Sequence, residues 1–203
     1  MFKTVASRVS VQRRETGETQ VSIRLDLDGT GRYELDTGNG MFDHLLAQLS
    51  RHGLMDLTVK ARGDIEVGWH HLVEDTGLVL GRAMREAVGD GVGIVRMAHA
   101  YAPLDEALAR AVVDFSGRGY SVLELNLGDS DLGGLSGDLV RHFLESLARE
   151  GGFNLHIQVL AGKNNHHKAE AAFKATARAA RAALTTDERL GSRVASTKGT
   201  ISD

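Results

Sequence analysis

The chain carries one five-residue pattern twice, and its residues are of the kinds that bind metal ions. His70-His71-Leu72-Val73-Glu74 and His166-His167-Lys168-Ala169-Glu170 both have the form H-H-x-x-E, 96 residues apart (166 − 70 = 96). Imidazole is the commonest metal ligand among side chains, and a carboxylate three or four residues further along a helix lies on the same face. The two copies predict a duplicated fold that presents two equivalent half-sites.

A third histidine is repeated in the same way. Aligning residues 43–53 with residues 141–151 places His44 on His142, 98 residues apart (142 − 44 = 98). Consecutive residues of a helix point about 100° apart, so the two histidines of one pair do not readily hold the same ion. The sequence therefore predicts two ions, each held by one histidine from each pair, by His44 or His142, and by one glutamate.

The composition limits both the metal and the class of protein. Cysteine is absent from the 203 residues, so the ligands are nitrogen and oxygen donors, which suit a divalent ion without choosing among Mn, Fe, Co, Ni and Zn. A net charge of −3 argues against a nucleic-acid partner, and no apolar run reaches the length of a membrane span. The first residues alternate as a strand does and lack a signal-peptide core. We expect a soluble cytoplasmic protein.

Apolar patterning predicts one domain made of two similar halves, about 1–91 and 92–203, joined at a glycine-rich linker over residues 89–93. The first half is expected to hold strands at 5–11, 21–27 and 54–61 and helices at 41–52 and 70–88. The second half is expected to hold strands at 94–100, 109–115, 120–127 and 153–160 and helices at 139–149 and 166–184. Asn165 is the expected cap of the last helix, and Lys174, Arg178 and Arg181 are expected on its polar face.

Further motifs accompany the histidines. They are RETGET (14–19), FDHLL (42–46), HHLVEDTG (70–77), PLDEALAR (103–110), DFSGR (114–118), NHHKAEAAFKA (165–175) and STKG (196–199). With this set in this order, the chain resembles the imidazoleglycerol-phosphate dehydratase family of histidine biosynthesis from about Arg8 to Ile201. It departs from the family pattern at Gly68-Trp69, where an acidic residue is common, at Ala195, where proline is common, and at Met41, where an aromatic is usual.

The resemblance implies a fold, an assembly and a metal content. The implied fold is α+β, an internal duplication with two four-stranded mixed sheets flanking a helical layer. The implied assembly is a homo-oligomer, a 24-mer built from trimers, with two Mn²⁺ ions per subunit at subunit contacts. One ion would be held by His70, His142, His166 and Glu170. The other would be held by His44, His71, His167 and Glu74.

The resemblance also implies a substrate and a reaction, the metal-dependent dehydration of imidazole glycerol phosphate to imidazole acetol phosphate. With both ring nitrogens on metal, the substrate's imidazole would become an imidazolate able to expel the adjacent hydroxyl. Glu170 or Glu18 would take the proton, and His70, His71 and Glu74 complete the expected catalytic set. Gln48 and Glu18 would line the substrate, with Asp105 near it. The phosphate would be bound by Arg96, Arg118, Lys174, Ser196 and Lys198.

Two other functions fit a pair of metals. A binuclear metallohydrolase acting on a phosphate ester would use water bridging the ions and would release free phosphate, whereas a dehydratase would retain the phosphate on a ketone. A metal-buffering assembly without catalysis would have no need for Arg96, Arg118, Lys174 and Lys198 to converge. The product that is formed separates these alternatives.

Overall fold

The computed structural model describes residues 8–128 and 130–201, and it confirms the expected α+β fold with two four-stranded mixed sheets. The first sheet runs, in spatial order, β1 (Val9–Glu15), β2 (Thr19–Asp26), β4 (Asp56–Gly63), β3 (Tyr33–Asp36). The second repeats this order with β5 (Met97–Leu104), β6 (Ala107–Asp114), β8 (Asn154–Ala161), β7 (Tyr120–Glu124). In each sheet the last pair is parallel and the others are antiparallel.

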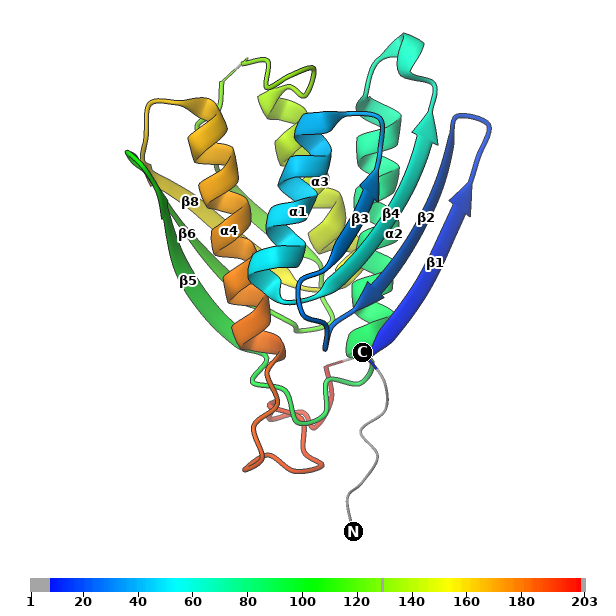
Figure 1. Cartoon of the computed structure of the whole chain (residues 1–203). Helices are drawn as coiled ribbons and strands as arrows, with labels where there is room; N and C mark the ends of the chain where they lie inside the picture. Colours follow the sequence, from blue (N-terminus) through cyan, green and yellow to red (C-terminus); the bar gives the residue numbers. More distant parts are fainter. Residues whose placement is uncertain (1–7, 129, 202–203) are drawn as a thin grey trace.

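The helices lie between the two sheets (Figure 1). They are α1 (Gly40–Gly53), α2 (His70–Val88), α3 (Gly137–Gly151) and α4 (Asn165–Leu184), with a short 3₁₀ helix η1 (Ile65–Val67) before α2. α2 packs on the first sheet and α4 on the second, while α1 packs on α4 and α3 packs on α2. The pairs of histidine-bearing helices therefore each combine one helix from the first half of the chain with one from the second.

The strands form because apolar residues alternate along them and turn toward the helices. In β2, Thr19, Val21, Ile23 and Leu25 are buried, while Gln20 and Arg24, which alternate with them, are exposed. Full burial of each of the apolar side chains contributes about 1.5–3 kcal/mol. The helices add a shared aromatic cluster at the centre, where Phe143 of α3 contacts Phe42 of α1 edge-on and stacks on Phe173 of α4.

Two glycines bring α2 and α3 unusually close together. A Cβ atom at Gly77 would lie 2.9 Å from the carbonyl oxygen of Phe143, and one at Gly81 would lie 2.7 Å from that of Leu147. Side chains at these positions would push the helices apart, because such distances are far inside van der Waals contact. The glycines thus allow the middle of α2 to pack closely against α3.

Several predicted boundaries differ from the structure. Strand β3 was missed, and β5 begins at Met97 rather than at residue 94 because Arg96 has a positive φ of 76° that breaks the extended run. Asn164, not Asn165, caps α4, and its side chain accepts from the backbone N–H groups of the paired histidines. The strand expected from residue 5 begins at Val9, and residues 5–7 lie outside the described part. Among the described residues, no helix is long and apolar enough to cross a membrane.

Candidate metal centre and phosphate pocket

The first cluster of metal donors lies between α1 and α4. His44 of α1 meets His166 and Glu170 of α4, with one donor atom of each within 4.8 Å of the others. Glu170 Oε2 lies 2.9 Å from His44 Nε2 and 3.2 Å from His166 Nε2. The carboxylate side chain is only 12% exposed, so its charge must be met by cations or by a metal ion.

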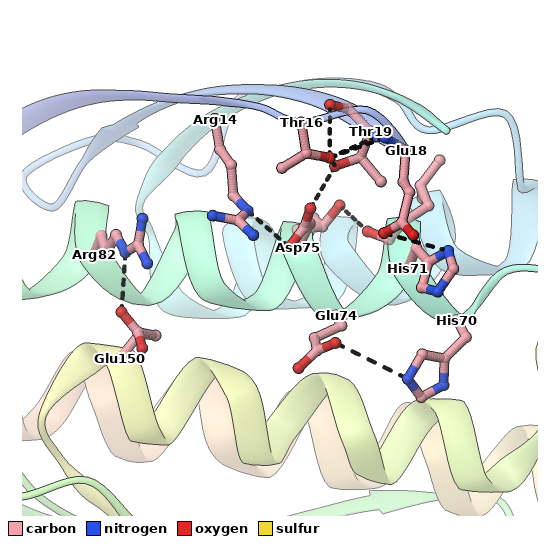
Figure 2. Close-up of polar contacts among 12 residues, drawn as sticks. Arg14, Thr16, Glu18, Thr19, His70, His71, Glu74, Asp75, Arg82 and Glu150 are labelled. Atoms are coloured by element: carbon pink, nitrogen blue, oxygen red, sulfur yellow. Dashed lines mark hydrogen bonds and ion pairs between the residues drawn. The ribbon is translucent and has the colours of Figure 1, made fainter. Parts of the chain in front are cut away.

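The second cluster is the counterpart of the first and lies between α2 and α3. His70 and Glu74 of α2 point toward α3 (Figure 2), where His142 completes the group. Glu74 lies 3.9 Å from His70 Nε2 and 3.7 Å from His142 Nε2. His142 Nε2 is buried and has no hydrogen-bond partner among the described residues. A buried polar atom without a hydrogen-bond partner is energetically costly. This nitrogen is therefore suited to bind a metal ion.

The second histidine of each pair faces away from both clusters. His71 turns from His70 toward Glu18 (Figure 2), and its Nδ1 lies 3.1 Å from a carboxylate oxygen of Asp64. The Nδ1 atom of His167 lies 2.8 Å from Glu106. A carboxylate that accepts the Nδ1–H proton fixes the ring and leaves Nε2 available as a ligand, as is usual for metal-binding histidines.

The charges around these rings shift several pKa values. Hydrogen bonds to Asp64 and to Glu106 raise the pKa of His71 and of His167, respectively. Burial raises the pKa of Glu170, but hydrogen bonds from Lys174 and His44 outweigh it and hold the pKa at about 2. Lys174 Nζ lies 2.6 Å from Glu170. Glu170 is therefore a stable anion, suited to bind a cation rather than to exchange protons near neutral pH.

This grouping differs from the two ligand sets that the family resemblance implied. His44 lies with Glu170, not with Glu74, and His142 lies with Glu74, not with His166. The reason is helix packing, because α1 lies on α4 and α3 lies on α2. Each cluster also contains only one member of an H-H pair, so within one chain neither ion would receive a histidine from both pairs.

A pocket of about 320 Å³ gathers most of the expected phosphate-binding residues. It is lined by Arg96, Arg118, Ser196 and Lys198, whereas Lys174 lies apart, paired with Glu170. In the described part of the chain, the side chains of Arg118 and Lys198 have no hydrogen-bond or ionic partner, so their charges remain available to an anion.

Arg96 is the most constrained residue of this pocket. Its guanidinium forms a two-point contact with Asp114 (2.7 and 3.1 Å) and donates to the carbonyl oxygen of Ala195 (2.8 Å). Proline offers the same carbonyl oxygen, so the departure from the family pattern at Ala195 leaves this contact intact.

The other expected substrate residues lie around the clusters. Gln48 is one turn after His44 on α1, and Asp105 is 3.8 Å from His167 Nε2. Glu18 is 59% exposed and lies 3.7 Å from His71 Nδ1. The hairpin that carries Glu18 is held to α2 by Asp75, which accepts from Thr19 and from Arg14 (2.8 Å; Figure 2).

The carboxylates that orient His71 and His167 were missed by sequence reasoning. Asp64, which directly follows β4, contacts Nδ1 of His71. Glu106 belongs to the motif at residues 103–110, but no function was predicted for it from the sequence. The repeat held a signal for it, because Glu106 directly precedes β6 as Glu18 directly precedes β2, and each lies beside the second histidine of a pair.

The chain is similar to known proteins of a single family. The family model of imidazoleglycerol-phosphate dehydratase matches residues 37–180. The imidazoleglycerol-phosphate dehydratase of Dinoroseobacter shibae is 52% identical over 188 residues, which cover 93% of this chain and 96% of that protein. The one from Dehalococcoides mccartyi (strain CBDB1) is 50% identical over 197 residues and covers 97% and 99% of the two chains.

Solved structures match as well. The imidazoleglycerol-phosphate dehydratase of Staphylococcus aureus superposes with a TM-score of 0.78 at 33% identity, covering 88% of this chain and all of that one. The enzyme from Pyrococcus furiosus, solved in complex with (S)-C348, superposes with the same TM-score at 35% identity and covers 92% and 98% of the two chains.

Proposed function

Because the chain belongs to the imidazoleglycerol-phosphate dehydratase family, it is a hydro-lyase of histidine biosynthesis, and we propose that it dehydrates imidazole glycerol phosphate with the help of two divalent metal ions. The product is imidazole acetol phosphate. The observation that carries the metal proposal is the twin clusters of histidine and glutamate, one of which contains the buried His142 Nε2, an atom without a hydrogen-bond partner among the described residues.

Each ion would take three ligands from one chain and a fourth from a neighbouring subunit. One ion binds His44, His166 and Glu170, and the other binds the second cluster, His70, Glu74 and His142. His71 and His167 supply the fourth ligands, because their Nε2 atoms face away from their own clusters while carboxylates hold their Nδ1 atoms. Sets of three nitrogens and one oxygen without thiolate suit Mn²⁺ among other divalent ions.

The outer faces of the two sheets support an assembly of identical chains. Outward-facing positions of the first sheet are strongly charged: Arg13, Glu15, Arg24, Glu34, Asp36, Lys60 and Arg62. On the outward face of the second sheet the acidic and basic residues are Arg110, Asp114 and Glu124. Gln158 joins Arg110 to Glu124 through two hydrogen bonds of 2.8 Å, and Asp114 is paired with Arg96. That face instead exposes Met97, Tyr101, Val112, Tyr120, Val122 and Leu160. A largely apolar face whose charges are paired suits contact with another copy of the chain.

In this proposal the chain's own residues have separate roles in phosphate binding and proton transfer. Arg118 and Lys198 hold the phosphate, while Ser196 and Arg96 shape the pocket around it. Glu18 enters the metal site of a neighbouring subunit together with His71 and accepts the proton from the substrate's side chain. Glu170 is not assigned this role, because its low pKa keeps it ionised beside its cationic partners. Two bound divalent ions would acidify the substrate's ring N–H and so ease departure of the adjacent hydroxyl.

The assay that tests this function follows two products from imidazole glycerol phosphate. Formation of imidazole acetol phosphate with no free phosphate supports the dehydratase. Release of inorganic phosphate would identify a metallohydrolase instead. If the metal-loaded protein forms neither product, metal storage is the function that remains.

Removal of metal is expected to abolish turnover and to shrink the particle. Chelation should take a 24-mer to a smaller species, a trimer in this proposal, because ions that bind only the assembled state stabilise it by mass action. Mn²⁺ should restore both properties. Elemental analysis, turnover and light scattering on the same samples test this. Full turnover or full mass in protein shown to be metal-free would contradict it.

Replacing Arg118 or Lys198 by alanine is expected to raise KM. Each loses a charge-assisted contact to the phosphate, worth about 1.5–3 kcal/mol, or roughly ten- to 150-fold. Arg96→Ala should also lower the free energy of unfolding, since it leaves Asp114 unpaired. Steady-state kinetics and denaturant unfolding separate the two effects. An unchanged KM in Arg118→Ala and Lys198→Ala would show that these are ordinary surface charges.

Metal affinity is expected to fall as the pH drops through the raised pKa values of His71 and His167. A ring must be unprotonated at Nε2 to bind metal, so a raised pKa moves the loss of affinity above the ordinary value of about 6.5. Mn²⁺ titrations across pH measure this. In Asp64→Asn the step that belongs to His71 should move to lower pH. A wild-type step at or below the ordinary value, unmoved in the variant, would contradict the proposal.

A further inference from the structure

A second hollow with a cationic edge lies between β5 and the last turns of α4, and it shares no lining residue with the neighbouring phosphate pocket. We call it the α4 groove. It has a volume of about 500 Å³ and is lined by His99, Ala100, Tyr101, Arg178, Arg181 and Ala182. Figure 1 shows the end of α4 beside β5. Arg178 is eight residues beyond Glu170, which places it about 12 Å further along the helix.

The matching position in the first half of the chain is closed by a polar cluster. There Glu86 of α2 accepts hydrogen bonds from Ser10 (2.5 Å) and from Gln12 of β1. Arg82 of α2 is paired with Glu150 of α3 at 2.9 Å (Figure 2). The arginine is thus neutralised, and side chains fill the space between helix and strand.

The second half keeps the arginines but lacks both the acidic partner of Arg82 and the polar cluster around Glu86. Arg82 and Arg85 correspond to Arg178 and Arg181, 96 residues on (178 − 82 = 181 − 85 = 96). The three polar residues that close the first half correspond to alanines: Glu86 to Ala182, and, from the strand registers, Ser10 to Ala98 and Gln12 to Ala100. The partner of Arg82, Glu150, corresponds to His52, 98 residues earlier (150 − 52 = 98).

The positive charge of the groove is therefore left uncompensated. Within the described residues, neither Arg178 nor Arg181 has a side-chain hydrogen bond or an acidic partner, and both are exposed. The positive charge also affects His52. Its pKa is lowered, first by burial and then by the nearby cations of Lys174 and Arg178. Two guanidinium groups at positions i and i+3 share one helix face and can together hold an oxyanion.

We propose that the α4 groove binds a small organic anion, with a phosphate or carboxylate head against Arg178 and Arg181 and an uncharged body over Ala100 and Ala182. This site is separate from the phosphate pocket of Arg118 and Lys198 and takes no part in the proposed dehydration.

The test uses phenyl phosphate as the probe and the intact metal-loaded protein, titrated by calorimetry. Wild type should show two binding events per chain. Ala182→Glu, which restores the acid that the first half carries, should weaken one event at least tenfold, and Arg181→Ala should weaken the same event. Arg85→Ala, the same change at the matching position of α2, should weaken neither. Arg118→Ala with Lys198→Ala should remove only the other event. Inorganic phosphate and phenol, titrated separately, assign the contributions of the head and the body.

All of the single substitutions in this test lie at exposed positions, and circular dichroism checks that each variant folds. A single binding event that Ala182→Glu leaves unchanged would overturn the proposal. So would the absence of probe binding in the groove together with a change of particle mass in Arg181→Ala, because this would mean that another copy of the chain covers the groove.

Discussion

Replacing Glu170 by glutamine is expected to lower kcat/KM by roughly 100-fold or more, because the change removes a metal ligand. Loss of a side chain that only orients a metal ligand already costs about 10–100-fold in metal affinity or activity. The carboxylate lies 2.9 Å from His44 and 3.2 Å from His166, and it is only 12% exposed. An amide in its place supplies no charge for the ion, and it also leaves Lys174 without its partner. Turnover and bound Mn²⁺, measured on the same samples, test the prediction.

The matched control is Glu86→Gln, the same chemical change on the helix that carries the other half-site. Glu86 of α2 contacts Ser10 and Gln12 and belongs to neither donor cluster. We expect this variant to keep its metal and its kcat/KM close to wild type. Circular dichroism separates loss of metal from loss of fold. Equal losses of activity in the two variants, or full metal content in Glu170→Gln, would remove Glu170 from the metal site.

The donors themselves could be found from the sequence because their pattern is local. Residues i and i+4 share a helix face wherever the helix lies, so His70 with Glu74 and His166 with Glu170 are visible in one dimension. How the donors group is set by helix packing, which no short motif encodes. His44 meets Glu170 because α1 packs on α4, so the grouping within one chain differs from the expected ligand sets for this reason.

Contacts from turns were harder to foresee than contacts from helices. Asp64 and Glu106 orient the second histidines from the ends of strands, at positions that no helical period marks. Strand β3 was missed because it has four residues, of which only Leu35 packs against the core. By contrast, β2 and α2 were recognisable from sustained alternation and from sustained helical spacing. The α4 groove results from missing side chains, and it becomes visible only when the two halves are compared in three dimensions.

Val112→Lys is expected to break the assembly into smaller particles, whereas Val11→Lys is not. Both valines lie on the outward face of a sheet, Val112 on the second and Val11 on the first. The proposed contact between copies covers the second sheet, and an unpaired lysine buried there would carry a large desolvation cost. The charged first sheet accepts another lysine in water. Light scattering on metal-loaded protein compares the two variants.

Both valine side chains are partly exposed in the single chain. In the single chain Val11 is 58% exposed and Val112 is 40% exposed, and that modest difference predicts only small and similar effects on the folding of one subunit. A large effect at Val112 alone therefore requires a partner surface. Activity should fall with particle mass, because His71 and His167 would then lack a neighbour's site to complete. A Val112→Lys protein that is small yet fully active would show that each chain completes its own metal sites, and both variants keeping full mass would place the contact between copies elsewhere.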